Sequence, residues 1–301
     1  MSKTQDILDS VDTLAPMPNT AVRLMRVIND PHASVENIID AIRYDQSVTS
    51  ALLKICNSAY AGLSRRITSI NDALVYLGTA KVLQLVMSVH ASSMYTCGQK
   101  GYGLQPGVLW RHSVAVALSA SLFADRIGIS DPNPAFTAGL LHGIGKTVMN
   151  EYVAEEFAEI LRLVATERLS FVEAEQQVLG VSHEEIGAQI AERWKLPEVI
   201  VRCIRYQYRP SDLTPPDVLV DAVHLAHCVC LMLGIGLGED GLCYRADSEV
   251  MKRHGLHEQD LEEVGLETIT ELDRIERLFA ESGHTVASAE AAATQERIDA
   301  G

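Results

Sequence analysis

Apolar residues recur at helical spacing along most of this 301-residue chain, and the alternating pattern of a half-buried strand is nearly absent. In the segment 19–29, for example, Val22, Met25 and Ile28 fall on one side. The segment 81–94 is apolar on most sides, which is typical of a helix surrounded by other helices. We therefore predict an all-α fold.

The charged residues are distributed unevenly, and this indicates where the chain divides. Residues 1–105 carry 9 basic and 8 acidic side chains, whereas residues 106–301 carry 16 and 32. The change coincides with the glycine-rich stretch 96–103, which would hold a helix poorly. We predict a helical N-terminal lobe over 1–105 that packs on a second helical lobe over 106–285. Residues 286–301 have almost no large apolar side chain and are predicted to form a mobile tail.

Composition excludes several classes of protein. No apolar run approaches the roughly 18 residues that span a membrane, and the segment 1–14 lacks the apolar stretch of a signal peptide. A formal net charge of −15 without a basic stripe disfavours nucleic-acid binding, which depends on neutralising phosphates. The six cysteines include no CxxC pair and are typical of reduced thiols. We expect a cytoplasmic protein that binds neither nucleic acid nor membrane.

Histidines are the first candidates for chemistry. His112, His142, His183 and His227 lie on four different predicted helices. Helices that bring neutral imidazoles inward can build a metal site. The alternative is that each is an isolated, hydrogen-bonded histidine, since no short metal-binding spacing links them.

Several short motifs follow one another in a recognisable order. The second half contains His112, then Leu141-His142-Gly143-Ile144-Gly145-Lys146, then His183 with Ile186-Gly187-Ala188. The first half contains Leu14-Ala15-Pro16-Met17-Pro18, Asp45-Gln46-Ser47-Val48-Thr49, Asn57-Ser58-Ala59-Tyr60 and Ile70-Asn71-Asp72-Ala73 leading to Leu77-Gly78. Over about residues 10–235 the chain resembles the HDOD branch of the HD phosphohydrolase superfamily. This resemblance implies a degenerate HD-like helical bundle and a bacterial signalling output module that has lost the hydrolase chemistry.

The chain also departs from the superfamily pattern. Active HD hydrolases use a His-Asp pair whose aspartate holds metal, and here Gly143 stands in the place of that aspartate. His227 aligns with the superfamily's late metal-binding aspartate. Because hard cations that activate water prefer carboxylate oxygens, we expect no hydrolysis and no cofactor. The alternative is a residual nitrogen-only site for a single transition metal ion, built from His112 and His142 with His227 and with His183 as a further candidate.

Two other candidate sites are weaker. His224 and Cys228 share a helix face, but Cys230 points elsewhere, so we interpret these cysteines as core residues. Lys146 follows a glycine, as the lysine of a phosphate-binding loop does. Leu140 stands where such a loop requires its first glycine, so we do not interpret this segment as a phosphate-binding loop.

We predict a non-catalytic signalling adaptor that acts through contacts with other signalling proteins, and a homodimer is compatible with the sequence. The candidate recognition surface is a groove between the lobes, with His112 and His142 on one side. Its other side would carry Asn57, Tyr60, Arg65 and Arg66. The alternatives are a metal-dependent phosphohydrolase with a histidine-rich site and a receptor that binds a nucleotide without turnover.

Overall fold

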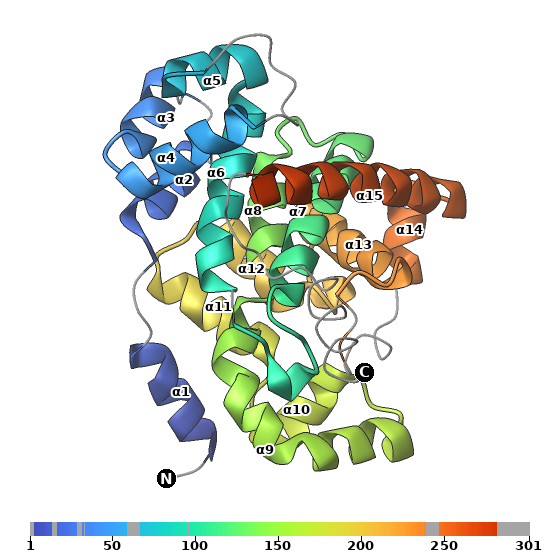
Figure 1. Cartoon of the computed structure of the whole chain (residues 1–301). Coiled ribbons are helices and arrows are strands. Elements are labelled where there is room, and N and C mark those ends of the chain that lie inside the picture. The colour runs from blue at the N-terminus through green and yellow to red at the C-terminus, as the bar shows by residue number, and fades with distance from the viewer. Residues whose placement is uncertain are drawn as a thin grey trace, which may run out of the picture.

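The computed structural model describes residues 3–13, 17–28, 32, 34–58, 67–95, 97–236, 238 and 247–281, and its regular elements there are helices (Figure 1). The predicted all-α fold is thereby confirmed. In chain order the elements are α1 (Lys3–Thr13), α2 (Asn19–Ile28), α3 (Val35–Ile42), α4 (Gln46–Cys56), α5 (Ile70–Leu77), α6 (Thr79–Met94), η2 (Lys100–Tyr102), α7 (Val108–Arg126), α8 (Asn133–Leu141), α9 (Ile144–Glu167), α10 (Phe171–Leu179), α11 (His183–Arg193), α12 (Glu198–Tyr206), η3 (Pro210–Asp212), α13 (Val218–Met232), α14 (Ser248–His254) and α15 (Glu258–Glu281). None of the described helices combines the length and the apolar character needed to cross a bilayer. The predicted tail, 286–301, lies outside the described residues.

Helices α2 to α6 form the N-terminal lobe, in which α6 contacts α2, α4 and α5 (Figure 1). The Asp45 carboxylate joins two of these helices. It accepts a hydrogen bond from the Val48 backbone at the start of α4 (3.0 Å) and one from the Thr20 hydroxyl on α2 (2.8 Å). One side chain therefore caps α4 and holds it against α2.

The first helix does not pack with this lobe. α1 lies against α9 and α11, on the side of the molecule away from α3 and α5 (Figure 1). Ile7 is fully buried there, and Arg193 of α11 donates to the carbonyl of Val11 (2.5 Å) and to the Asp12 carboxylate (3.0 Å). α1 thus precedes the N-terminal lobe in sequence but contacts helices from the second half of the chain.

α7 is the central helix of the second half and contacts α8, α13 and α15. Trp110 on α7 is buried, its indole N–H donates to the carbonyl of Ser88 on α6 (3.1 Å), and its ring packs on Phe279 of α15 with 5.1 Å between centroids. Buried side chains of both halves form one continuous hydrophobic core. Trp110 therefore fixes the N-terminal lobe, the central helix and the last helix relative to one another.

Two glycines allow helices around the histidines to approach closely. A Cβ at Gly139 of α8 would lie 2.8 Å from the Cα of Ala117 on α7. A Cβ at Gly145, in the first turn of α9, would overlap the carbonyl oxygen of His183 and lie 2.7 Å from the nitrogen of Gly187 on α11. Both contacts are with backbone atoms, which cannot move aside as a side chain can.

We predict that Gly145→Ala destabilises the protein by about 1–3 kcal/mol or more, because the added methyl group overpacks the contact between α9 and α11. Gly143→Ala is the matched control, since its φ of −91° suits any residue and a Cβ there would meet only side-chain atoms, Leu109 Cδ1 at 3.2 Å and Ser113 Oγ at 3.9 Å. Its cost should stay below about 1 kcal/mol. Urea unfolding measures both variants, and equal losses would contradict this account.

Candidate functional site

Three of the four predicted histidines meet at the centre of the second half of the chain. His112 lies on α7, His142 is the C-cap residue of α8, and His227 lies on α13. Each is at most 2% exposed, and the ring centroids lie 5.1 to 5.2 Å apart. One ring nitrogen from each lies within 4.8 Å of one from each of the others. We call this group the three-histidine cluster.

Backbone carbonyls orient two of the rings. Nδ1 of His112 lies 2.8 Å from the oxygen of Ile235, and Nδ1 of His142 lies 2.6 Å from the oxygen of Gly139. A carbonyl only accepts, so each Nδ1 donates its proton and each Nε2 of a neutral ring keeps a lone pair. Nε2 of His112 lies 3.3 Å from Nδ1 of His227. Nε2 of His142 is buried and makes no hydrogen bond with any described residue.

The surroundings keep two of the three rings neutral, those of His142 and His227. Burial, with a smaller effect of His112, holds the pKa of His142 and of His227 well below its usual range. The charge of Lys146 acts in the same direction on both rings. Lys146 is itself buried, and its ammonium lies 5.1 Å from the ring centroid of Tyr102. At neutral pH the imidazoles of His142 and His227 are therefore available as uncharged nitrogen ligands.

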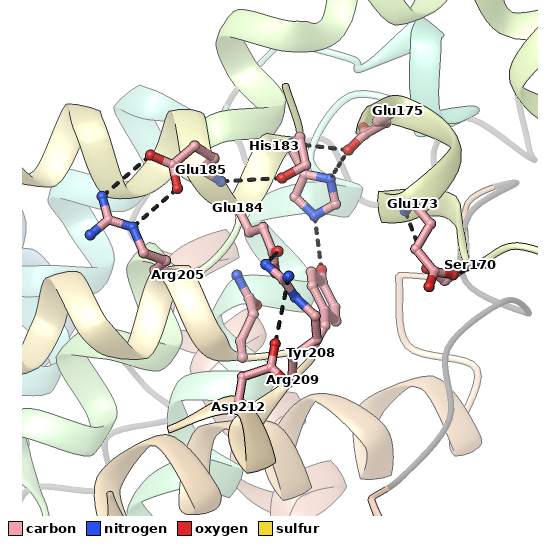
Figure 2. Close-up of polar contacts among 12 residues, drawn as sticks. Ser170, Glu173, Glu175, His183, Glu184, Glu185, Arg205, Tyr208, Arg209 and Asp212 are labelled. Carbon is pink, nitrogen blue, oxygen red and sulfur yellow. Dashed lines mark hydrogen bonds and ion pairs between the residues drawn. The ribbon is translucent and has the colours of Figure 1, made fainter. Parts of the chain in front are cut away.

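His183 lies beside the cluster rather than in it. Its Nδ1 is 2.7 Å from the buried Glu175 carboxylate, which also accepts hydrogen bonds from the His183 backbone (3.0 Å) and from the Tyr102 hydroxyl (2.7 Å). Its Nε2 is 3.0 Å from the hydroxyl of Tyr208 (Figure 2). The Tyr208 ring packs edge-on against His227, with 5.0 Å between centroids. Both ring nitrogens of His183 are thus engaged, and Tyr208 connects it to the cluster.

A pocket of about 580 Å³ reaches this connection, because Tyr208 and His227 both line it. Glu184 lines the same pocket and is fully buried, and it forms an ion pair with Arg209 (Figure 2). Burial raises the pKa of Glu184 to about 7, against the opposing effect of Arg209. The remaining lining residues are Arg168, Ser170, Val172, Glu173, Gln176, Gln177, Ser182, Arg209, His224 and Cys228.

The predicted recognition surface is described only at Asn57. The Asn57 amide donates to the carbonyls of Leu53 and Ile67 (both 2.7 Å) and accepts from the Ile67 backbone (2.8 Å), so it joins the end of α4 to Ile67. Asn57 also lines a surface hollow of about 460 Å³. Three other predicted residues lie outside the described part of the chain, namely Tyr60, Arg65 and Arg66.

The opposite side of the predicted groove is not at the surface. His112 and His142 are 2% and 0% exposed, and neither lines the hollow at Asn57. The helices around the three-histidine cluster cover both rings, so neither ring can contact a protein partner directly.

His224 and the two cysteines form no second metal site in the described structure. Nδ1 of His224 donates to the carbonyl of Gln207 (2.7 Å), and Nε2 accepts from the Asp247 backbone (2.8 Å). Cys228 lies 3.8 Å from that Nε2, and Cys230 is buried in the core. These contacts agree with the interpretation of both cysteines as core residues.

The motifs in the sequence do not point to the carboxylates and the tyrosine that line and support the pocket. Glu175 stands four residues from both Phe171 and Leu179, so it shares the buried apolar face of α10. This spacing could have identified it as a buried carboxylate. Nothing comparable singles out Glu184 or Tyr208, because their positions depend on how α11 and the end of α12 meet.

The profile of the HDOD domain family matches residues 14–210. An uncharacterized protein of Treponema pallidum is 26% identical over 206 residues, which cover 67% of this chain and 39% of that protein. An HDOD domain protein of unknown function from Geobacter sulfurreducens has a similar structure, with a TM-score of 0.71 at 27% identity over 93% of this chain and 97% of that chain. A protein of Marinobacter aquaeolei named as a candidate signal transduction protein gives a TM-score of 0.73 at 23% identity, over 93% of this chain and 66% of that chain.

We predict that the stability difference between Glu184→Gln and the unchanged protein depends on pH. A pKa raised from 4.5 to about 7 means that Glu184 stabilises the fold at low pH and loses this contribution as pH rises through 7. As the pH rises from 4.5 to 7.5, the free energy of unfolding of the variant should therefore increase by about 3 kcal/mol relative to that of the unchanged protein. Urea unfolding across this range measures the difference.

Glu185→Gln is the control for the substitution itself, because the neighbouring Glu185 side chain is 38% exposed and pairs with Arg205 (Figure 2). A Glu184→Gln difference that stays constant with pH would contradict the assignment of a buried carboxyl at this position.

Proposed function

This chain belongs to the HDOD domain family, and we propose that it is a signal-transduction module that acts through contacts with other proteins and does not turn over a substrate. The family assignment supports the signalling class. The composition of the three-histidine cluster supports the absence of hydrolysis.

The cluster has the wrong donors for a hydrolytic pair of hard metal ions. No Asp or Glu side chain joins His112, His142 and His227 within the part of the chain that the structure describes. Gly143, in the place of the superfamily's metal-binding aspartate, offers no ligand at all. Mg²⁺ and Mn²⁺ bind carboxylate oxygens in preference to imidazole, and a bridging carboxylate would be needed to hold two ions side by side. The absence of that carboxylate is the single observation that carries the proposal.

Exposed apolar side chains support a role in protein contacts. Met232 and Leu233 at the end of α13 are 72% and 38% exposed, and Leu266 and Ile269 on α15 are 69% and 44% exposed. A Cβ at Gly265 would lie 3.4 Å from Leu233 Cδ1, so the end of α13 meets α15 near these side chains. We call these four residues the α13–α15 apolar patch, and exposed apolar side chains that gather on a surface are typical of protein-binding sites.

The pocket favours one alternative, a receptor that binds a nucleotide without hydrolysing it. Arg168 and Arg209 both line it, and guanidinium groups pair well with phosphate. The structure offers no comparable support for a phosphohydrolase, because the residues that would hold its metal ions do not fit that role.

We predict that the purified protein releases no phosphate from nucleotides or cyclic dinucleotides in the presence of Mn²⁺ or Mg²⁺, because it lacks the carboxylates that would hold an activating ion. Phosphate release by the unchanged protein and by His142→Ala should be indistinguishable. Turnover that disappears in His142→Ala would overturn the proposal. A nucleotide that raises the unfolding temperature without being consumed would favour the receptor instead.

We further predict that two double variants weaken the capture of partners from the native cell. Arg65→Glu with Arg66→Glu reverses the predicted cationic surface, and Leu266→Ser with Ile269→Ser removes half of the α13–α15 apolar patch. Mass spectrometry quantifies the captured proteins against the unchanged chain.

Arg23→Glu with Arg26→Glu is the charge control, because both side chains are exposed on α2 of the N-terminal lobe. If one test variant captures fewer partner proteins, the surface that it changes is identified as the contact with those partners. Undiminished capture by both test variants would count against a role through these surfaces.

A further inference from the structure

We propose that the three-histidine cluster binds one divalent transition metal ion of intermediate softness, such as Zn²⁺, through one nitrogen each of His112, His142 and His227. The proposal goes beyond the signalling role, since the ion would need neither a substrate nor a partner protein.

The spacing of the nitrogens suits a four-coordinate ion. Zn–N bonds of about 2.0–2.1 Å at tetrahedral angles place two ligand nitrogens roughly 3.3 Å apart. Nε2 of His112 and Nδ1 of His227 are 3.3 Å apart, and a nitrogen of each of the three rings lies within 4.8 Å of one of each other ring. Small side-chain rotations would close the remaining separations around one ion.

Two of the three rings already have the tautomer of a metal ligand. Nδ1 of His112 and of His142 each donates to a backbone carbonyl, which directs the Nε2 lone pair of each ring away from that bond. Metal-bound histidines almost always donate their other ring N–H in this way. Nε2 of His142 is fully buried without a hydrogen-bond partner among the described residues, although buried polar atoms are normally satisfied. An ion at the cluster would satisfy it.

The donor set and the nearby charge select the kind of ion. Three imidazoles suit Zn²⁺, Cu²⁺ or Ni²⁺, whereas Mg²⁺ and Mn²⁺ lack the oxygen ligands they prefer. The charge of Lys146 acts on both His142 and His227 and opposes any cation. Binding therefore depends on strong metal–nitrogen bonds, which hard cations do not form with imidazole. Three protein ligands leave a fourth position for a donor from the pocket, which His227 also lines.

Cobalt and zinc titrations of the full-length chain test this proposal. The experiment uses a Cys97→Ser background, because Cys97 is an exposed free thiol that could bind metal by itself. We expect one Co²⁺ per chain with the intense visible absorption of a four-coordinate ion and without a thiolate charge-transfer band. Stoichiometric Zn²⁺ should displace it, and Mg²⁺ should not. Elemental analysis after gel filtration gives the zinc content.

His142→Ala, His112→Gln and His227→Gln should each weaken Co²⁺ binding at least tenfold. His90→Ala is the matched control, because His90 is another buried histidine with an unpartnered Nε2 but lies on α6 outside the cluster. Circular dichroism identifies which variants fold, and any one folded cluster variant suffices for the comparison. The site is supported if the folded cluster variant loses the absorption of four-coordinate Co²⁺ and His90→Ala keeps it. Absence of stoichiometric binding, or equal binding by the cluster variant, overturns it and leaves the proposed signalling role unaffected.

Discussion

The packing of α7 against both α8 and α13 brings the three histidines of the cluster together. α8 approaches α7 closely because Gly139 has no side chain to hold it away from Ala117. The turn after α13 approaches from another side, where Gly236, at a φ of +73°, lies against the His112 ring and leaves no room for a Cβ. These contacts bring three imidazoles within reach of one another. A fold that left more space here would give separate, solvated histidines.

Two buried carboxylates lie beside the cluster rather than in it. Glu175 accepts hydrogen bonds from His183 and Tyr102, and Glu184 pairs with Arg209. The cluster itself contains no carboxylate among the described residues. A buried carboxylate is tolerated only with such partners, and neither of these two joins the group of nitrogens that could hold an ion. This separation is the physical reason for favouring nitrogen chemistry at the cluster.

Much of this arrangement follows from the sequence, but only where local pattern decides it. Helical periodicity was sufficient for the all-α fold, and the order of the HD-like motifs pointed to His112, His142 and His227. Neither pattern indicates the angle at which the helices cross. That angle buries His112 and His142 instead of exposing them in a groove, and it engages His183 with Glu175 and Tyr208 beside the cluster. For the same reason the position of α1 could not be predicted, because its contacts are with helices more than a hundred residues away.

The cluster and the proposed protein-binding surface share one rigid element. α13 carries His227 in the cluster and ends at Met232 in the α13–α15 apolar patch, about one and a half turns further along. An α-helix of this length moves as a unit, so a displacement of α13 at His227 also displaces Met232 and its contacts with α15. Under the proposed function, a change at the cluster would reach the surface that a partner meets through α13. The proposed metal-binding centre and the proposed protein-binding surface would then be coupled by one helix, which requires the ion to bind two positions of α13 with different affinity.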